Sequence, residues 1–171
     1  MEAWLERLRG EIEDTTQGLS GDDWSRAPQG RWNIAQILEH LGLSYGATAK
    51  MLELKLAAGS APQLPAAKFS EWLLRMAVVR LGYFPSGRKA PEFVTPKGEG
   101  SPESLTRTLG GLERMKVALA AAEERWGSRE AVGTHFALGP MNPEQWRKFH
   151  YLHGHHHARQ IRERLGSKAR G

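Results

Sequence analysis

Apolar side chains repeat at helical spacing in four long stretches of this chain, and that periodicity constrains the fold more than any other feature. None of these stretches shows the alternation of apolar and polar residues that is typical of a β-strand. A shorter apolar stretch lies at residues 68–82. We therefore predict an all-α protein, a four-helix bundle with one extra short helix, whose long helices cover residues 1–18, 32–58, 101–126 and 142–165.

The predicted helix boundaries rest on local start and stop signals. Ser101 can cap the third long helix, with Pro102 at its first position. Asn142 and Gln145 have the spacing of a capping box before the last helix, and Gly166 is typical of a helix end. The segments between the helices contain glycine and proline and are predicted to be connectors: 18–31, 59–65, 82–100 and 127–141.

Length and composition exclude several classes of protein. A chain of 171 residues fits one domain, which we expect to span residues 1–171. The absence of cysteine excludes disulfides, thiolate metal ligands and cysteine nucleophiles. The sequence contains no run of 18 apolar residues, so we predict no membrane span. The first twenty residues lack the apolar centre of a signal peptide. We therefore expect a cytoplasmic protein with no membrane partner.

The formal net charge of +5 raises the possibility of nucleic-acid binding. Much of the positive charge lies near the C-terminus, however, where Arg159, Arg162 and Arg164 end the last predicted helix and Lys168 and Arg170 follow. Cations at a helix C-terminus interact favourably with the helix dipole. We prefer this interpretation, a solvated helix end, and predict no nucleic-acid partner.

Histidines gather near the C-terminus, where five of the seven lie within eight residues. An expression tag is one explanation, but tags lie outside structured segments, and this cluster lies inside a well-capped amphipathic helix. On that helix His153 and His157 share a face with Trp146, whereas His155 points the opposite way and should be exposed. Spacing i, i+4 stacks two imidazoles one turn apart, which suits two bonds to one metal ion.

A buried histidine pair needs partners for its ring nitrogens. This favours a metal site over the alternative, in which both histidines are core residues with hydrogen-bond partners. The best third ligand is His40, which lies in line with Asn33, Gln36 and Ser44 on the second long helix. This polar strip is either the wall of a pocket or a solvated flank, and periodicity does not decide between them. The alternative third ligand is His135, in the loop before the last helix.

Two motifs resemble those of a known superfamily. Trp32 followed by IAQILEHL resembles the start of the metal-binding helix of the DinB-like (YfiT-type) superfamily. The segment PEQWRKFHYLHGHHHARQI resembles its closing motif, and the run HFALGPMNPEQW before it resembles an uncharacterised branch. The resemblance implies a four-helix bundle of up-down-down-up order with a three-histidine metal site. By position, His40, His153 and His157 match the three ligands.

The resemblance also implies functions and partners. The superfamily includes small-thiol-dependent transferases and isomerases and metal-dependent hydrolases, and homodimers are common in it. This chain departs from the pattern in its third consecutive histidine, His155, and in the long loop at residues 82–100.

The ligand set narrows the chemistry without identifying a substrate. Three neutral histidines leave a metal ion fully cationic, and zinc or nickel is the first expectation. Open coordination positions would support hydrolysis by metal-activated water, or would activate a low-molecular-weight thiol for transfer to a small-molecule substrate. The alternative is a non-catalytic or structural metal site, which a fourth ligand from His135 or His150 would favour. Gln160, one turn beyond His157, could bond the free N–H of a ligand, and the 82–100 loop could form the rim of the pocket.

Overall fold

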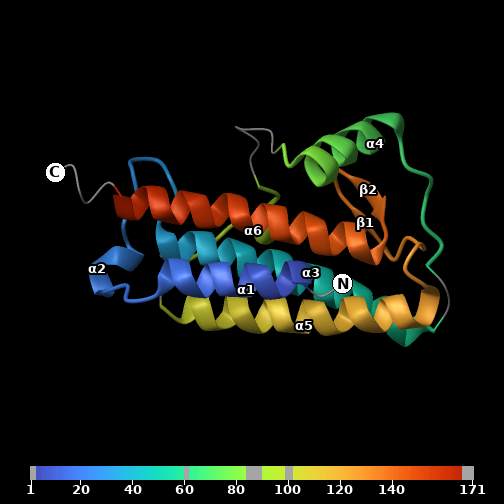
Figure 1. The fold of residues 1–171 in the computed structure, drawn as a ribbon, viewed down its shortest axis with the longest axis horizontal. Helices are drawn as coiled ribbons and strands as arrows, with labels where there is room; N and C mark the ends of the chain where they lie inside the picture. The colour runs from blue at the N-terminus through green and yellow to red at the C-terminus, as the bar shows by residue number, and fades with distance from the viewer. Residues whose placement is uncertain (1–2, 60–61, 84–89, 99–101, 167–171) are drawn as a thin grey trace.

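A computed structural model describes residues 3–59, 62–83, 90–98 and 102–166. Within this part of the chain, four long helices lie side by side, and shorter elements lie toward both ends of them (Figure 1). The long helices are α1 (Ala3–Thr16), α3 (Ile34–Ala58), α5 (Glu103–Trp126) and α6 (Pro143–Gly166). The shorter elements are α2 (Gly21–Trp24), α4 (Phe69–Arg75), the π-helix η1 (Met76–Arg80), the 3₁₀-helix η2 (Glu92–Val94), and the strands β1 (Gly133–His135) and β2 (Gly139–Met141). The prediction of a mostly helical protein is confirmed.

The two helices that carry the histidines each begin with a capping box, a pair of reciprocal hydrogen bonds between side chains and backbone N–H groups. Before α6, the side chain of Asn142 accepts from the backbone N–H of Gln145 at 2.9 Å, and the Gln145 side chain accepts from the backbone N–H of Asn142 at 3.1 Å. Asn33 and Gln36 form the same box at the start of α3. Gly59 ends α3 with a positive φ of 77°, a conformation that suits glycine. The predicted cap at Ser101 lies outside the described residues.

The long helices pack in two pairs of like direction. The first pair is α3 and α5. Thr108 of α5 donates to the carbonyl of Leu38 near the start of both helices, and Arg125 of α5 donates to the carbonyl of Gly59 near their ends. The second pair is α1 with α6, and it runs opposite to the first pair (Figure 1). A Cβ atom on Gly111 would lie only 3.2 Å from the carbonyl oxygen of Gly42, so these glycines let α3 and α5 approach closely.

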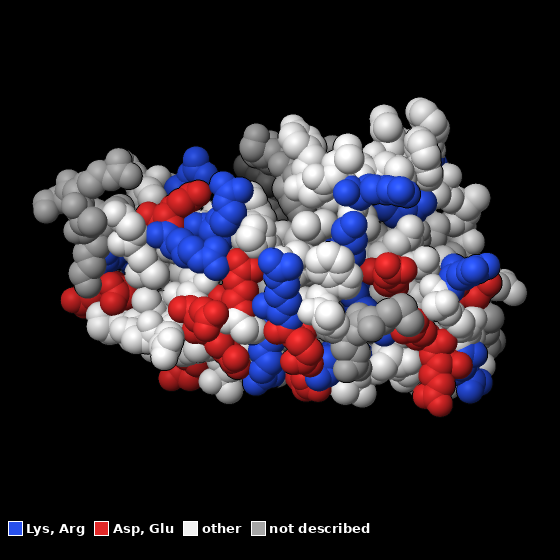
Figure 2. Space-filling model, viewed as in Figure 1, with Lys and Arg blue, Asp and Glu red and all other residues white. Residues whose placement is uncertain are grey.

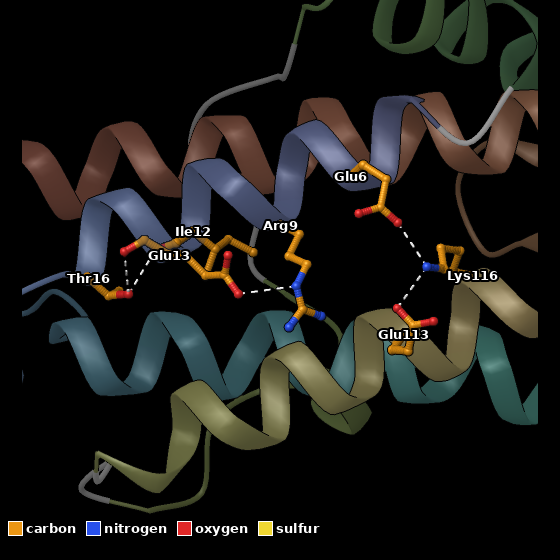
Figure 3. Close-up of polar contacts among 7 residues, drawn as sticks. All are labelled: Glu6, Arg9, Ile12, Glu13, Thr16, Glu113 and Lys116. Atoms are coloured by element: carbon orange, nitrogen blue, oxygen red, sulfur yellow. Dashed lines mark hydrogen bonds and ion pairs between the residues drawn. The ribbon is translucent and has the colours of Figure 1, made fainter.

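The core lies between these four helices and is formed by the apolar arcs that the sequence predicts. Its fully buried members include Leu8 and Ile12 of α1, Leu41 of α3 and Leu119 of α5. Polar contacts join the helices outside the core. The ammonium of Lys116 on α5 lies 2.8 Å from Glu6 of α1 and 3.0 Å from Glu113 (Figure 3).

The structure differs from the predicted elements in residues 127–141, which the sequence assigns to a connector. Three residue pairs form a small antiparallel hairpin there, from Gly133 opposite Met141 to His135 opposite Gly139. Strands of three residues containing glycine and proline are too short to show alternation, so the pattern could not reveal them. Arg75 holds the hairpin against α4, because its guanidinium donates to the carbonyls of Leu138 and Pro140.

The short helix predicted at residues 68–82 is present as α4 continued by η1, but its apolar face is only partly buried. Val78 and Val79 enter the core, whereas Phe69 is 76% exposed and Leu73 is 55% exposed. Elsewhere on the face seen in Figure 2, acidic and basic side chains alternate over α1 and α5. None of the described helices combines the length and apolarity that crossing a membrane requires.

Candidate metal centre

Three histidines from two helices meet in the middle of the bundle. His40 comes from α3, and His153 and His157 come from successive turns of α6. The Nε2 atom of His153 lies 3.1 Å from that of His40 and 3.1 Å from that of His157. One ligand atom from each of the three lies within 4.8 Å of the other two, so the group could hold a metal ion. The structure thus brings together the three residues selected from the sequence.

The surrounding bonds orient two of these rings. The Nδ1–H of His40 donates to the backbone carbonyl of Val94 at 2.7 Å, since a carbonyl oxygen can only accept. The Nδ1–H of His157 donates to the side-chain oxygen of Gln160 at 3.0 Å. In a neutral imidazole this leaves a lone pair on each Nε2, both facing the Nε2 of His153. An Nε2–H on His153 could satisfy only one of these two lone pairs, whereas a shared cation would satisfy both, so the three nitrogens fit a metal ion.

Burial keeps the three rings in the form that a metal needs. It lowers the pKa of His40, although the bond to Val94 opposes the shift. It lowers the pKa of His157 to about 3 and that of His153 well below its usual range. Metal binding requires the neutral imidazole, so these groups offer their lone pairs at neutral pH without first losing a proton.

Part of the 82–100 loop lies beside the histidines, and it contacts His40 through a group that the sequence does not reveal. Ala90, Pro91, Phe93 and Val94 of this segment line the cavity beside the histidines. The Val94 carbonyl, in η2, orients His40. Any residue carries such a carbonyl, so no side-chain pattern could have pointed to Val94. Residues 84–89 and 99–100 of the loop lie outside the described residues.

The two candidates for a closing ligand, His135 and His150, lie outside the three-histidine group, and each has one ring nitrogen in a hydrogen bond. His150 is buried, and its Nε2 lies 3.0 Å from the hydroxyl of Thr48. The Nδ1 of His135 accepts from the backbone N–H groups of Ala137 and Leu138 at 3.1 and 3.2 Å. Burial lowers the pKa of His150 to about 3 and that of His135 to about 4. Neither belongs to the group that could hold a metal within the described residues.

The polar strip beside His40 divides into two parts. Ser44 lines the cavity, and its hydroxyl donates to the carbonyl of His40 at 2.8 Å. Asn33 and Gln36 are not among the residues that line this cavity; they form the capping box of α3. Their spacing is the same as that of Asn142 and Gln145, so the sequence did contain the signal for a cap.

Two further residues of α6 also differ from expectation. His155 is only partly exposed, because its Nδ1 lies 2.9 Å from a carboxylate oxygen of Glu11 on the neighbouring α1. Arg164, counted among the solvated cations at the helix end, turns inward and donates to the carbonyls of Trp32 and Gln160 at 2.7 and 2.8 Å. In both cases a neighbouring segment supplies the partner, which helix periodicity alone does not show.

The histidine cluster opens into a cavity of about 910 Å³, within the range of small-molecule sites. The cavity is bounded by α3, α6, the hairpin, η1 and the 82–100 loop. Its lining combines polar and charged side chains, among them Thr48, Gln160 and Arg164, with aromatic and aliphatic ones. The three rings therefore border a space that a small molecule could enter.

The protein is thus a helical bundle in which three imidazoles converge beside a cavity and form a candidate metal centre. The family model described as the DinB superfamily matches residues 5–161. The chain therefore belongs to the DinB superfamily, as its motifs indicate. Among the curated proteins and the solved structures compared with this chain, none matches it.

Proposed function

We propose that this protein binds one divalent transition metal, zinc or nickel, through His40, His153 and His157 and uses it in catalysis. The observation that carries the proposal is the convergence of three Nε2 atoms, two of which are lone-pair donors by virtue of their Nδ1 bonds. Membership of the DinB superfamily supports it. Imidazole ligands suit both metals, so the metal's identity rests on measurement.

An open site supports a catalytic role over a structural one. Structural zinc has four protein ligands, whereas catalytic zinc has three and keeps a position for substrate. Within the described residues the possible ligand group contains three members, and neither His135 nor His150 belongs to it. The cluster also borders a cavity, which a closed structural site does not need.

The chain's own residues have separable roles in this proposal. His40, His153 and His157 would hold the ion, while Val94 and Gln160 fix the orientation of two of the rings. Aromatic and aliphatic side chains of the cavity would exclude water from the substrate. When bound, the ion would supply a Lewis acid of undiminished charge, because all three ligands are neutral.

We propose a metal-dependent hydrolase or a small-thiol-dependent transferase acting on a small molecule. The test is a panel of small esters, amides and thiol–acceptor pairs. It is run with metal-loaded protein, with chelator-treated protein and with the His153→Ala variant. Turnover that requires both the metal and His153 is expected. Metal binding without turnover of any pair would favour the alternative, a non-catalytic metal-binding module.

We also infer that the helices follow the up-down-down-up order within one domain spanning residues 1–171, and that the protein forms a homodimer. The like directions of α3 with α5 and of α1 with α6 support the first inference. The superfamily resemblance supports the second. Light scattering coupled to size-exclusion chromatography tests it, and a monomeric mass at micromolar concentration would contradict it.

A further inference from the structure

The cavity beside the histidines is cationic at one end. Arg31 and Arg164 both line it, and no carboxylate lines it among the described residues. The two guanidinium groups influence each other electrostatically. Burial lowers the pKa of Arg164, Glu163 raises it in part, and the charge of Arg31 lowers it again. The lining therefore favours an anion at this end.

The cationic end lies next to the histidine cluster. Arg164 follows His157 by seven residues, but its side chain turns back along α6 and donates to the carbonyl of Gln160 at 2.8 Å. Gln160 in turn contacts the Nδ1 of His157. The guanidinium is thus about one helical turn, roughly 5 Å, beyond the histidine level. A single ligand could therefore place an anionic group there and another group at the three Nε2 atoms, with only a few bonds between the two groups.

Toward the hairpin, the described part of the cavity lining carries no Lys, Arg, Asp or Glu and is rich in apolar side chains. Trp146 and Phe149 precede His153 on α6, and Met51 follows His40 by three turns on α3. Met51 and Trp146 both pack against Gly133 of the hairpin, whose Leu138 also lines the cavity. The cavity therefore passes from apolar side chains, past the imidazole cluster, to two guanidinium groups.

We propose that this cavity binds amphipathic carboxylates in which an apolar acyl group is joined through a short linker to the carboxylate, as in N-acyl amino acids. The acyl chain occupies the hairpin end, the acyl carbonyl lies at the histidines, and the carboxylate binds Arg31 and Arg164. Only the role of the three histidines rests on the proposed metal function. The two ends of the cavity can bind the ligand without it.

The probe is N-decanoylglycine, compared with N-decanoylethanolamine, which is similar in length but neutral, and with N-decanoylethylenediamine, which is cationic. Binding is followed by tryptophan fluorescence, because Trp32 and Trp146 line the cavity. Titrations use both zinc-loaded and chelator-treated protein. The acid should bind about tenfold more tightly than the neutral probe, since charge-assisted hydrogen bonds are stronger than neutral ones. The cationic probe should bind most weakly.

Variants separate the two ends of the cavity. Arg31→Gln and Arg164→Gln should each weaken binding of the acid about tenfold and leave the neutral probe unaffected. Arg31 is exposed, so its replacement keeps the test valid even if Arg164→Gln disturbs folding. Arg159→Gln removes an exposed charge from α6 outside the cavity and should change nothing. Ala47→Phe, in the cavity wall between His40 and Met51, should weaken N-decanoylglycine more than N-butanoylglycine.

Equal affinity for the three decanoyl probes, or the same loss with Arg159→Gln as with Arg31→Gln, would overturn the inference. A separate zinc titration distinguishes this failure from that of the proposed function. Zinc binding without preference for the acid rejects the carboxylate site alone. Preference for the acid that depends on Arg31, in a protein that does not bind zinc or nickel, supports the carboxylate site and rejects the metal function.

Discussion

The Nε2 atoms of His40 and His153 lie 3.1 Å apart although 113 residues separate them in the chain. This proximity depends on the packing of α3 against α6, which run in opposite directions across the bundle (Figure 1). Neither helix carries the complete ligand set, so metal binding would join the two helices. A ligand that binds only the folded state also stabilises that state.

Replacing His153 with alanine should abolish metal binding, because this ring contacts both of the other two ligands. The matched control is His155→Ala on the same helix, whose ring bonds to Glu11 instead. Elemental analysis of purified protein should find close to one metal ion per chain in the wild type and the control, and almost none in His153→Ala. Equal metal content in all three proteins would refute the assignment.

Gln160→Leu should weaken metal affinity about 10- to 100-fold, because the His157 ring loses the acceptor that orients it. Gln160→Glu retains an oxygen at this position and should keep most of the affinity. Competition with a chromogenic chelator measures both constants. If leucine and glutamate variants bind zinc as tightly as the wild type, Gln160 does not support the site.

Gly154→Ala should destabilise the fold by about 1–3 kcal/mol through overpacking. A Cβ atom at this position would lie 2.8 Å from the hydroxyl of Tyr45 and would overlap Leu8 of α1. Gly10→Ala in α1 is the control, because nothing lies within 4 Å of its added Cβ. That change should stabilise the protein by roughly 0.5–1 kcal/mol through helix propensity. Urea denaturation of both variants checks the opposite signs.

The metal-free protein should lose stability as the pH falls below about 6.5. Burial lowers the pKa of His150 to about 3 and that of His135 to about 4, so between these values and 6.5 the unfolded chain binds more protons than the folded one. The free energy of unfolding therefore rises with pH across this window, by roughly 1 kcal/mol per pH unit for each such histidine. Denaturation of chelator-treated protein at pH 7 and pH 5 measures the slope.

His150→Gln should remove the contribution of His150 to the slope of unfolding free energy against pH and leave the contribution of His135. Glutamine cannot take up a proton in this range, whatever its effect on stability at pH 7. An unchanged slope in the variant would show that His150 is not kept neutral by the fold.

What the sequence by itself determined is local. The i, i+4 spacing of His153 and His157 on the face of Trp146 depends only on helical geometry, and the structure places both rings in one cluster. The capping box of Asn142 and Gln145 is equally local, because its partners are three residues apart. Long helices with strong periodicity could therefore be predicted, together with two of the three candidate ligands. His40 was preferred to His135 as the third ligand because of its place beside a polar strip, and the family motif agrees with that choice.

What only the tertiary structure decided involves partners distant in the chain. Three contacts join separate segments of the chain. The Val94 carbonyl orients His40, the Glu11 carboxylate bonds His155, and Arg164 turns inward to the carbonyl of Trp32. Helical periodicity shows which face a side chain occupies but not which segment packs against that face. For the same reason the cavity, with an apolar end at the hairpin and a cationic end at Arg31 and Arg164, emerges only once the helices are packed.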